Sequence, residues 1–496
     1  MHLRPTGHQP SQPGASHRQP DRQLDRQIGL RSAVTLNMLE MVGVGPFITL
    51  PLIVAAMGGP QAMLGWILGA LLAVCDGLVW AELGAALPYA GGSYAFLREI
   101  YGPRGAGRMI SFLYVWQFTL TAPLSIASGA IGLAEYAVYL VPRLNHSLLS
   151  SSFPPFLLQH SRGTVLLAIA VCCLAMLLLY RQTRVVERIA WFLSAGLLLT
   201  IAAVLFACFT HFHPALAFGF PPGAFHLSGS FFQGLGAATL MATYCYWGYY
   251  NICFLGAEVR DPGRTIPRAV LYSILGVAAL YLLMNIGILG AVPWQDLLGR
   301  YSHSRSSGDN PVAAVALVIG HIMGPVYGRI VVGLVMWTAF ASLFSLLLGA
   351  SRVPYAAASE GNYFRSLQQL HPTRGFPARS LLLLGGIACI CCFFDLKTVI
   401  QALVALRIVL QFLLQQVGVI VLRRRAPDLP RPFRMWLYPI PALVACAGFL
   451  FMLFSRHGAG RELIAALIVS VSGSVVYLLR ANKRREWPFL PNSPAL

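Results

Sequence analysis

The stretch AVTLNMLEMVGVGPFITLPLIVAAMG (Ala33–Gly58) is long enough to cross a bilayer as a helix, yet its centre reads Gly43-Val44-Gly45-Pro46. Two glycines and a proline at mid-depth interrupt the hydrogen-bond ladder of a helix. In lipid, such a gap is tolerated only where protein or a water-filled cavity satisfies the freed backbone groups. The sequence therefore predicts a broken membrane helix, which is typical of the substrate site of a secondary transporter.

The composition is that of an integral membrane protein. Of the 496 residues, 57% are hydrophobic and 11% are charged, whereas soluble domains have roughly 25% charged residues. Apolar runs close to the length of a spanning helix lie at 33–58, 62–87, 109–141, 163–180, 188–210, 231–258, 269–292, 327–350, 380–394, 398–422, 437–454 and 462–479. We therefore expect an all-α protein with twelve transmembrane helices, in which residues 31–482 form a single transporter domain.

The placement of the positive charge predicts a topology. If the N-terminus is cytoplasmic, 27 of the 36 Lys and Arg residues fall on the cytoplasmic side and seven on the outer side. This asymmetry follows the positive-inside rule and predicts cytoplasmic N- and C-termini in the cell membrane, plasma or inner. Residues 1–30 are expected to form a disordered cytoplasmic tail, and residues 483–496 a second tail. A nucleic-acid partner is not expected, because the sequence contains no soluble basic domain.

A second interrupted span is expected at 231–258. Its centre, Tyr246-Trp247-Gly248-Tyr249-Tyr250-Asn251, is aromatic and polar, unlike the other apolar runs. Glycine-interrupted spans at corresponding positions of two halves indicate an inverted-repeat transporter. Spans 1–5 and 6–10 would form the two repeats, with helices 1 and 6 broken and spans 11 and 12 appended.

The two breaks offer complementary groups for a zwitterion. The half-helix after the first break presents free N–H groups, which suit a carboxylate. Unpaired carbonyl groups at the second break suit an ammonium group. We therefore expect substrate to bind at Gly43, Val44, Gly45, Tyr246, Trp247, Gly248 and Asn251. The alternative is that these glycines only permit close packing of helices.

Four stretches carry a family resemblance: MVGVGPF after Glu40, Ala81–Pro103, Gly256–Ala269 and Arg423–Pro439. They resemble the amino acid–polyamine–organocation superfamily over nearly all of residues 32–480. Within that superfamily, the chain is similar to bacterial amino acid permeases, L-type light subunits and plant polyamine transporters. The resemblance implies the leucine-transporter fold and alternating access around a site between spans 1, 3, 6, 8 and 10. It implies an amino acid permease and not an enzyme.

The first break departs from the family pattern Gly-Ser-Gly-Ile. Val44 supplies no hydroxyl group, and Pro46 has no N–H to offer a carboxylate. An acid shortly before Gly-Pro-Phe also resembles the plant polyamine transporters, so transport of putrescine or spermidine is the alternative function. A channel-like or regulatory membrane protein is a third, weaker reading.

Two charged residues inside spans are candidates for function. Glu40 lies about one turn before the first break, where it could bind a substrate ammonium, carry a coupling proton or cap the loosened backbone. Arg407 lies some ten residues into span 10 and is expected to form an ion pair with a membrane acid. The candidate partners are Glu40, Glu82 and Glu135, of which Glu82 is expected to be a structural acid at a helix end. Trp247 is expected to gate the cavity or face an ammonium group.

The sequence leaves the ion that drives transport open. Span 5 has no Lys, and Ser342 and Ser345 on span 8 stand three residues apart, so one sodium site using both is not expected. Proton symport through Glu40 and obligate exchange both stay open.

We expect no cofactor, metal or Walker A motif. All ten cysteines lie in apolar runs, and the loop 142–162 has none, so no disulfide-linked heavy subunit is expected. The expected partners are the lipid bilayer and a small-molecule substrate, amino acid or polyamine.

Overall fold

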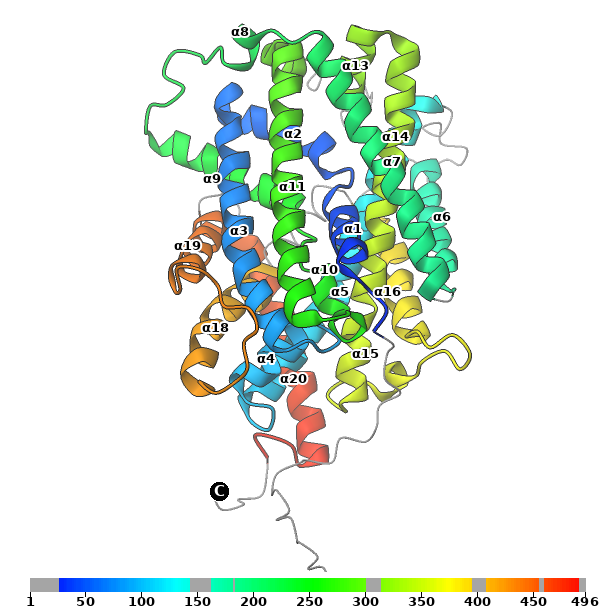
Figure 1. Ribbon diagram of the computed structural model, residues 1–496, viewed down its shortest axis with the longest axis vertical. Coiled ribbons are helices and arrows are strands. Elements are labelled where there is room, and N and C mark those ends of the chain that lie inside the picture. The colour runs from blue at the N-terminus through cyan, green and yellow to red at the C-terminus, as the bar shows by residue number, and fades with distance from the viewer. Residues whose placement is uncertain are drawn as a thin grey trace, which may run out of the picture.

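The computed structural model describes residues 26–142, 162–181, 183–299, 314–394, 407–454 and 459–489. These residues fold mainly into helices (Figure 1). The longer helices are α1 (Leu30–Met41), α2 (Gly45–Met57), α3 (Met63–Ala86), α5 (Ala106–Leu140), α6 (Arg162–Leu179), α7 (Thr183–Thr210), α9 (Gly229–Tyr246), α11 (Pro262–Ala291), α13 (Ala314–Met323), α14 (Pro325–Ala350), α16 (Ala378–Cys391), α18 (Leu414–Arg425), α19 (Ile440–Phe454) and α20 (Ala459–Arg484). The shorter ones are η1 (Pro60–Ala62), α4 (Ser93–Tyr101), α8 (Pro214–Ala217), α10 (Asn251–Phe254), η3 (Gly256–Glu258), α15 (Arg352–Ser359), η5 (Arg365–Gln368) and the π-helical η6 (Ile408–Leu413).

Several helices are suited to a bilayer. Within the described residues, α3, α5, α7, α11 and α14 are long and apolar enough to cross a membrane. The pair α1 and α2, bent by 47° at its break, passes the same test as a sixth span. Shorter apolar helices form at α6, α16 and α19. The chain is therefore a multi-pass membrane protein, while the expected count of twelve spans stays a prediction, partly because 395–406 lies outside the described residues.

Helices that are distant in the chain pack against one another. The most extensive contacts join α3 to α11, α5 to α14, and α3 to α9, and α2 also packs on α9. In the predicted order these are spans 2 and 7, 3 and 8, 2 and 6, and the two broken spans 1 and 6. In Figure 1, α3 and α11 run side by side along the long axis. Gly77 of α3 lies at this contact, where an added Cβ would be 2.3 Å from Ile274 Cδ1 and would displace the end of that side chain.

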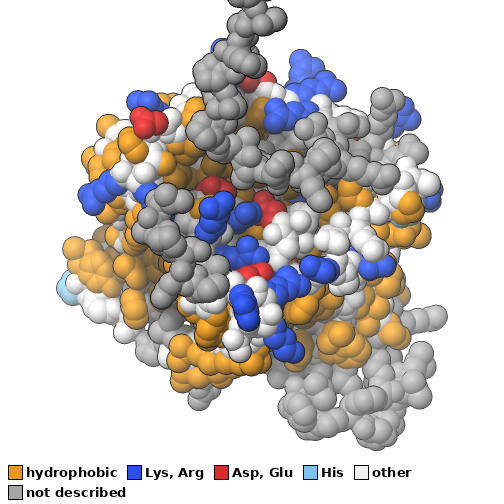
Figure 2. Space-filling model, turned by 90° about the horizontal axis from the view of Figure 1, so that it is seen from below, with side chains coloured by type: hydrophobic (Ala, Val, Ile, Leu, Met, Phe, Trp, Pro, Cys, Tyr) orange, Lys and Arg blue, Asp and Glu red, His pale blue; other side chains and the backbone are white. Residues whose placement is uncertain are grey.

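One end of the molecule is basic. Figure 2 views the end where the C-terminus lies in Figure 1, and Lys and Arg side chains gather on that face. Ion pairs there include Arg108 with Glu486, at 2.8 Å, and Arg480 with Glu486, at 3.1 Å. This is the face that the charge count predicts to be cytoplasmic, and we refer to it below as the basic end.

The last residues of the expected N-terminal tail contact the body of the protein. The backbone N–H groups of Gln27 and Ile28 donate to Glu258 O at 2.9 and 3.0 Å, and Arg260 N donates to Ile28 O at 2.9 Å. This backbone pairing fixes the start of α1 against η3. Residues 1–25 of the expected tail lie outside the described residues.

Candidate functional site

The two predicted helix breaks are both present, and they contact each other. The first lies between Met41 and Gly45, and the second between Tyr246 and Asn251. Gly248 has a φ of +125°, a backbone conformation that L side chains rarely adopt. A Cβ at Gly248 would lie 2.8 Å from Met41 N. The second break therefore packs directly on the C-terminal end of α1, with no room for a side chain.

Buried amide side chains secure the second break. Asn37 of α1 donates to Tyr249 O at 2.6 Å and accepts from Ile252 N at 3.0 Å. Asn251 donates to Ser345 Oγ of α14 at 3.0 Å. Because the unwound segment lacks a helical ladder, these side chains replace part of its lost backbone pairing.

Hydroxyl groups of α14 complete the end of α1. Ser342 Oγ donates to Glu40 O at 2.8 Å, and Ser345 Oγ donates to Leu36 O at 2.8 Å. The last carbonyl groups of a helix have no partner within the helix. Ser342 therefore satisfies a carbonyl group that the break in span 1 leaves free, and Ser345 adds a bond to the Leu36 carbonyl one turn earlier.

A cavity of about 60 Å³ lies where the two breaks meet α5 and α14. One water molecule needs a cavity volume of roughly 10–15 Å³, so this cavity has room for several water molecules or a small solute. Of the predicted site residues, it is lined by Glu40, Gly43, Val44, Gly45, Trp247 and Arg407. The sequence therefore located residues from both breaks and from span 10 on one cavity.

The other predicted residues lie beside the cavity lining. Tyr246 packs at a tilt against Tyr281, with ring centroids 5.3 Å apart, and edge-on against Trp66. Gly248 provides the contact between the breaks, and Asn251 bonds to α14. In this structure these three residues support the break.

Three hydroxyl-bearing lining residues were not predicted from the sequence. Ser125 and Ser128 of α5 and Tyr244 of α9 add hydroxyl groups to the cavity wall, as does Ser342 of α14, which the sequence suggested only in connection with a sodium site. Ser128 Oγ and the Tyr244 hydroxyl are 2.9 Å apart. The sequence did contain a signal for two of them, because Ser125 and Ser128 are three residues apart in an apolar run and so lie on one face of a helix.

The list of membrane acids drawn from the sequence was incomplete. Asp76, in the middle of α3, is fully buried and accepts hydrogen bonds from the Tyr249 hydroxyl and the Gln416 side-chain amide. It joins α3 to the second break and to α18. Asp76 was missed because it lies inside an otherwise apolar run, although an acid at such a position is itself a signal.

Glu82 has the contacts of a structural acid. Its carboxylate accepts two hydrogen bonds from Arg423, at 2.7 and 2.6 Å, and one from Met435 N at 2.8 Å. Arg423 also lies over the Tyr438 ring, with Cζ 3.8 Å from the centroid. These contacts fix α3 to the end of α18 and the segment after it.

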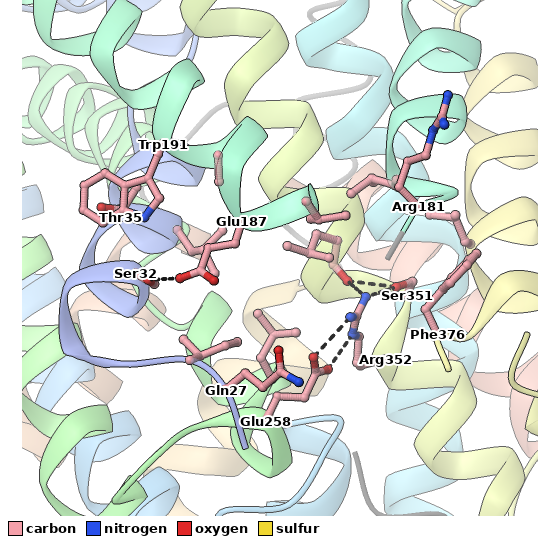
Figure 3. A pocket seen from close by; sticks show the side chains of 18 residues that line it. Gln27, Ser32, Thr35, Arg181, Glu187, Trp191, Glu258, Ser351, Arg352 and Phe376 are labelled. Atoms are coloured by element: carbon pink, nitrogen blue, oxygen red, sulfur yellow. Dashed lines mark hydrogen bonds and ion pairs between the residues drawn. The ribbon is translucent and has the colours of Figure 1, made fainter. Parts of the chain in front are cut away.

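A second pocket, of about 40 Å³, lies nearer the basic end between α1, α7, α14 and α16 (Figure 3). Ser32 Oγ donates to Glu187 Oε1 at 2.6 Å and links α1 to α7. Arg352 Nε donates to Glu258 Oε1 at 3.0 Å and links α15 to η3, and both side chains are buried. Figure 3 shows these two links on the walls of the pocket. We call this space the inner pocket.

Comparison with known proteins identifies the family of the chain. A family model described as amino acid permease matches residues 28–474. The chain belongs to the amino acid permease family. This is a family of transporters within the amino acid–polyamine–organocation superfamily, so the permease is not an enzyme.

Individual relatives cover most of the permease. The Asc-type amino acid transporter 1 of Mus musculus is 28% identical over 472 residues, 92% of this chain and 81% of the relative. The serine/threonine exchanger SteT of Bacillus subtilis (strain 168) is 25% identical over 445 residues, 88% and 92% of the two chains. The large neutral amino acids transporter small subunit 2 of Homo sapiens is 27% identical over 466 residues, 92% and 80% of the two chains.

Proposed function

We propose that the permease moves neutral α-amino acids across the cell membrane by alternating access. The observation that carries this proposal is the cavity at which both broken helices meet. Broken helices expose backbone polar groups at mid-membrane, where a polar solute otherwise finds no partners. The twelve-span leucine-transporter fold with cytoplasmic termini is part of the same proposal.

The inner pocket is proposed as the cytoplasmic half of the route. It shares α1 and α14 with the cavity, and Leu36 lines the inner pocket one turn before Glu40 of the cavity. Between them lie the bonds from Ser345 to Leu36 O and from Asn251 to Ser345. Opening toward the cytoplasm would require α1 to leave α14 and to break the link from Ser32 to Glu187.

The substrate class follows from the relatives together with the size of the cavity. The relatives quoted above are described as transporters of amino acids, of large neutral amino acids, or as an exchanger of serine and threonine. A cavity of about 60 Å³ suits a small amino acid, and the hydroxyl groups of Ser125, Ser128 and Tyr244 offer polar contacts.

Exchange is the proposed mode of coupling, with proton symport as the alternative. Sodium coupling is not proposed, because Ser342 and Ser345 each donate to a different α1 carbonyl group. A covalent heavy-subunit partner is also not proposed. One relative is described as a small subunit, but this chain has no cysteine in residues 142–162 for a disulfide tether.

Ligand-induced thermal stabilisation of the purified permease tests the substrate class. A ligand that binds the folded state raises the unfolding midpoint according to its concentration relative to Kd. We expect alanine and serine to raise the midpoint, and putrescine and spermidine to leave it unchanged. Stabilisation by the polyamines alone would overturn the proposal.

A further inference from the structure

Arg407 lines the cavity with a guanidinium group that is incompletely paired. Its side chain is only 3% exposed. Nη1 donates to the Tyr250 hydroxyl at 2.9 Å and Nη2 to Ser125 Oγ at 3.0 Å, so both acceptors are neutral. Nε has no hydrogen-bond partner among the described residues. A guanidinium group has five N–H donors that match a carboxylate in a two-pronged geometry.

Aromatic rings hold this guanidinium group in place. Arg407 Cζ lies 5.5 Å from the Trp247 ring centroid and 6.0 Å from that of Phe118. These contacts come from the second break and from α5. The cation is therefore held by rings and hydroxyl groups, and it is still available to an anion.

Glu40 lines the same cavity with an unpaired oxygen. The residue is 8% exposed, and Oε2 has no hydrogen-bond partner in the described part of the chain. The ion pairs of the described residues do not include one between Glu40 and Arg407. One acid and one base thus face a common space without direct contact. A carboxyl oxygen and a guanidinium N–H that both lack partners, on one cavity, match a ligand that carries an ammonium and a carboxylate group.

The backbone sites expected at the breaks are partly unavailable. At the first break, Pro46 has no N–H, and Phe47 N donates to Val44 O at 3.1 Å. At the second break, Tyr249 O accepts from Asn37, and Cys245 O accepts from the Tyr281 hydroxyl at 3.2 Å. A zwitterion therefore finds fewer free backbone groups here than the helix breaks alone would suggest.

We propose that Arg407 binds the α-carboxylate of the substrate and that Glu40 binds its α-ammonium group. This inference rests on the proposed function and assigns charge recognition to two side chains, from span 10 and span 1. The permease then requires both charges on its ligand. It rejects amines and amides that lack the carboxylate, and it disfavours polyamines because Arg407 repels a polycation.

The test compares ligands that differ in one charge. Binding of alanine, alaninamide and lactate to the purified permease is measured by thermal shift over a range of concentrations. In the wild type, alanine is expected to bind at least ~100-fold more tightly than either analogue, because a buried charged partner would be left unpaired. Equal binding of alanine and alaninamide by the wild type would overturn the assignment of Arg407.

Variants separate recognition from structural support. In R407Q, the affinities for alanine and alaninamide are expected to lie within about 3-fold of each other. In E40Q, the affinities for alanine and lactate should likewise lie within about 3-fold of each other. The matched control is R329Q, since Arg329 is exposed on α14 and away from the cavity. A structural role would lower binding of all three ligands and leave their ratios unchanged.

R407K separates the charge of Arg407 from its two-pronged geometry. If R407Q does not fold, R407K retains the charge but not the two-pronged geometry, and its preference for alanine over alaninamide should drop by roughly 10-fold. An unchanged ratio in R407K or R407Q overturns the inference while leaving amino acid transport intact. If the wild type binds no amino acid, the proposed function itself fails.

Discussion

Gly248 of the second helix break lies against Glu40 of the first so closely that a Cβ at Gly248 would be 2.9 Å from Glu40 Cγ. This contact makes the two breaks one unit, because neither can change shape without displacing the other. It also places Glu40 on the cavity wall. The site is therefore defined by the junction of the breaks and not by either break alone.

Substitution of Gly248 by alanine should disable the junction. The added Cβ meets backbone atoms of Met41, and the φ of +125° is unfavourable for alanine; strain of this kind costs about 1–3 kcal/mol. We expect a lower unfolding midpoint and at least ~10-fold slower uptake by G248A in proteoliposomes. The control is G276A on α11, where a Cβ meets no atom of the described residues within 4 Å. Equal behaviour of the two variants would contradict the proposed contact.

Asn37 is expected to be required for stability. Its side chain bonds both Tyr249 O and Ile252 N, so N37A leaves a buried acceptor and a buried donor unpaired. Each such group costs about 1–3 kcal/mol. Thermal unfolding in detergent should show a clear drop in midpoint, whereas N482A, at an exposed position of α20, should unfold like the wild type. An unchanged N37A midpoint would mean that the break is held by other contacts.

Asp76 should tolerate asparagine but not alanine. Asparagine can still accept a hydrogen bond from the Tyr249 hydroxyl. If the Gln416 side-chain amide flips, the asparagine NH₂ group can donate to Gln416 Oε1, which has no partner among the described residues. We expect D76N to retain the wild-type unfolding midpoint within a few degrees. D76A leaves two buried donors unpaired at about 1–3 kcal/mol each. Similar loss in both variants would indicate that the carboxylate charge itself is needed.

Glu82 is expected to act in stability rather than in substrate recognition. E82Q weakens the two-pronged pairing with Arg423, and because the Arg423 side chain is 21% exposed, we expect a cost below the roughly 3–5 kcal/mol of a fully buried pair. The unfolding midpoint should fall while the preference for alanine over alaninamide is unchanged. D428N, at an exposed position after α18, is the control. A changed ligand preference in E82Q would be inconsistent with this role.

The sequence was sufficient to predict both breaks and the cavity that joins them. Glycine and proline in an apolar run are local signals, and Gly43-Val44-Gly45-Pro46 and Gly248 provided them. The family resemblance, on four quoted stretches, was also confirmed by the match over residues 28–474.

The partners of the charged residues could not be predicted in the same way. Arg407 was expected to pair with an acid, but its contacts among the described residues are two hydroxyl groups and two aromatic rings. Asp76 was overlooked, and its partners lie 173 and 340 residues away in the chain. Such contacts depend on how distant helices pack, and periodicity along one helix does not reveal them.

Counterflow in proteoliposomes tests the central claim most directly. Purified wild-type permease is reconstituted in liposomes containing unlabelled alanine, serine and leucine, and uptake of external radiolabelled alanine is followed. The account predicts saturable uptake that is stimulated by the internal amino acids and competed by external serine but not by alaninamide or putrescine. Uptake of labelled putrescine in place of alanine, or uptake of alanine that does not saturate, would contradict it.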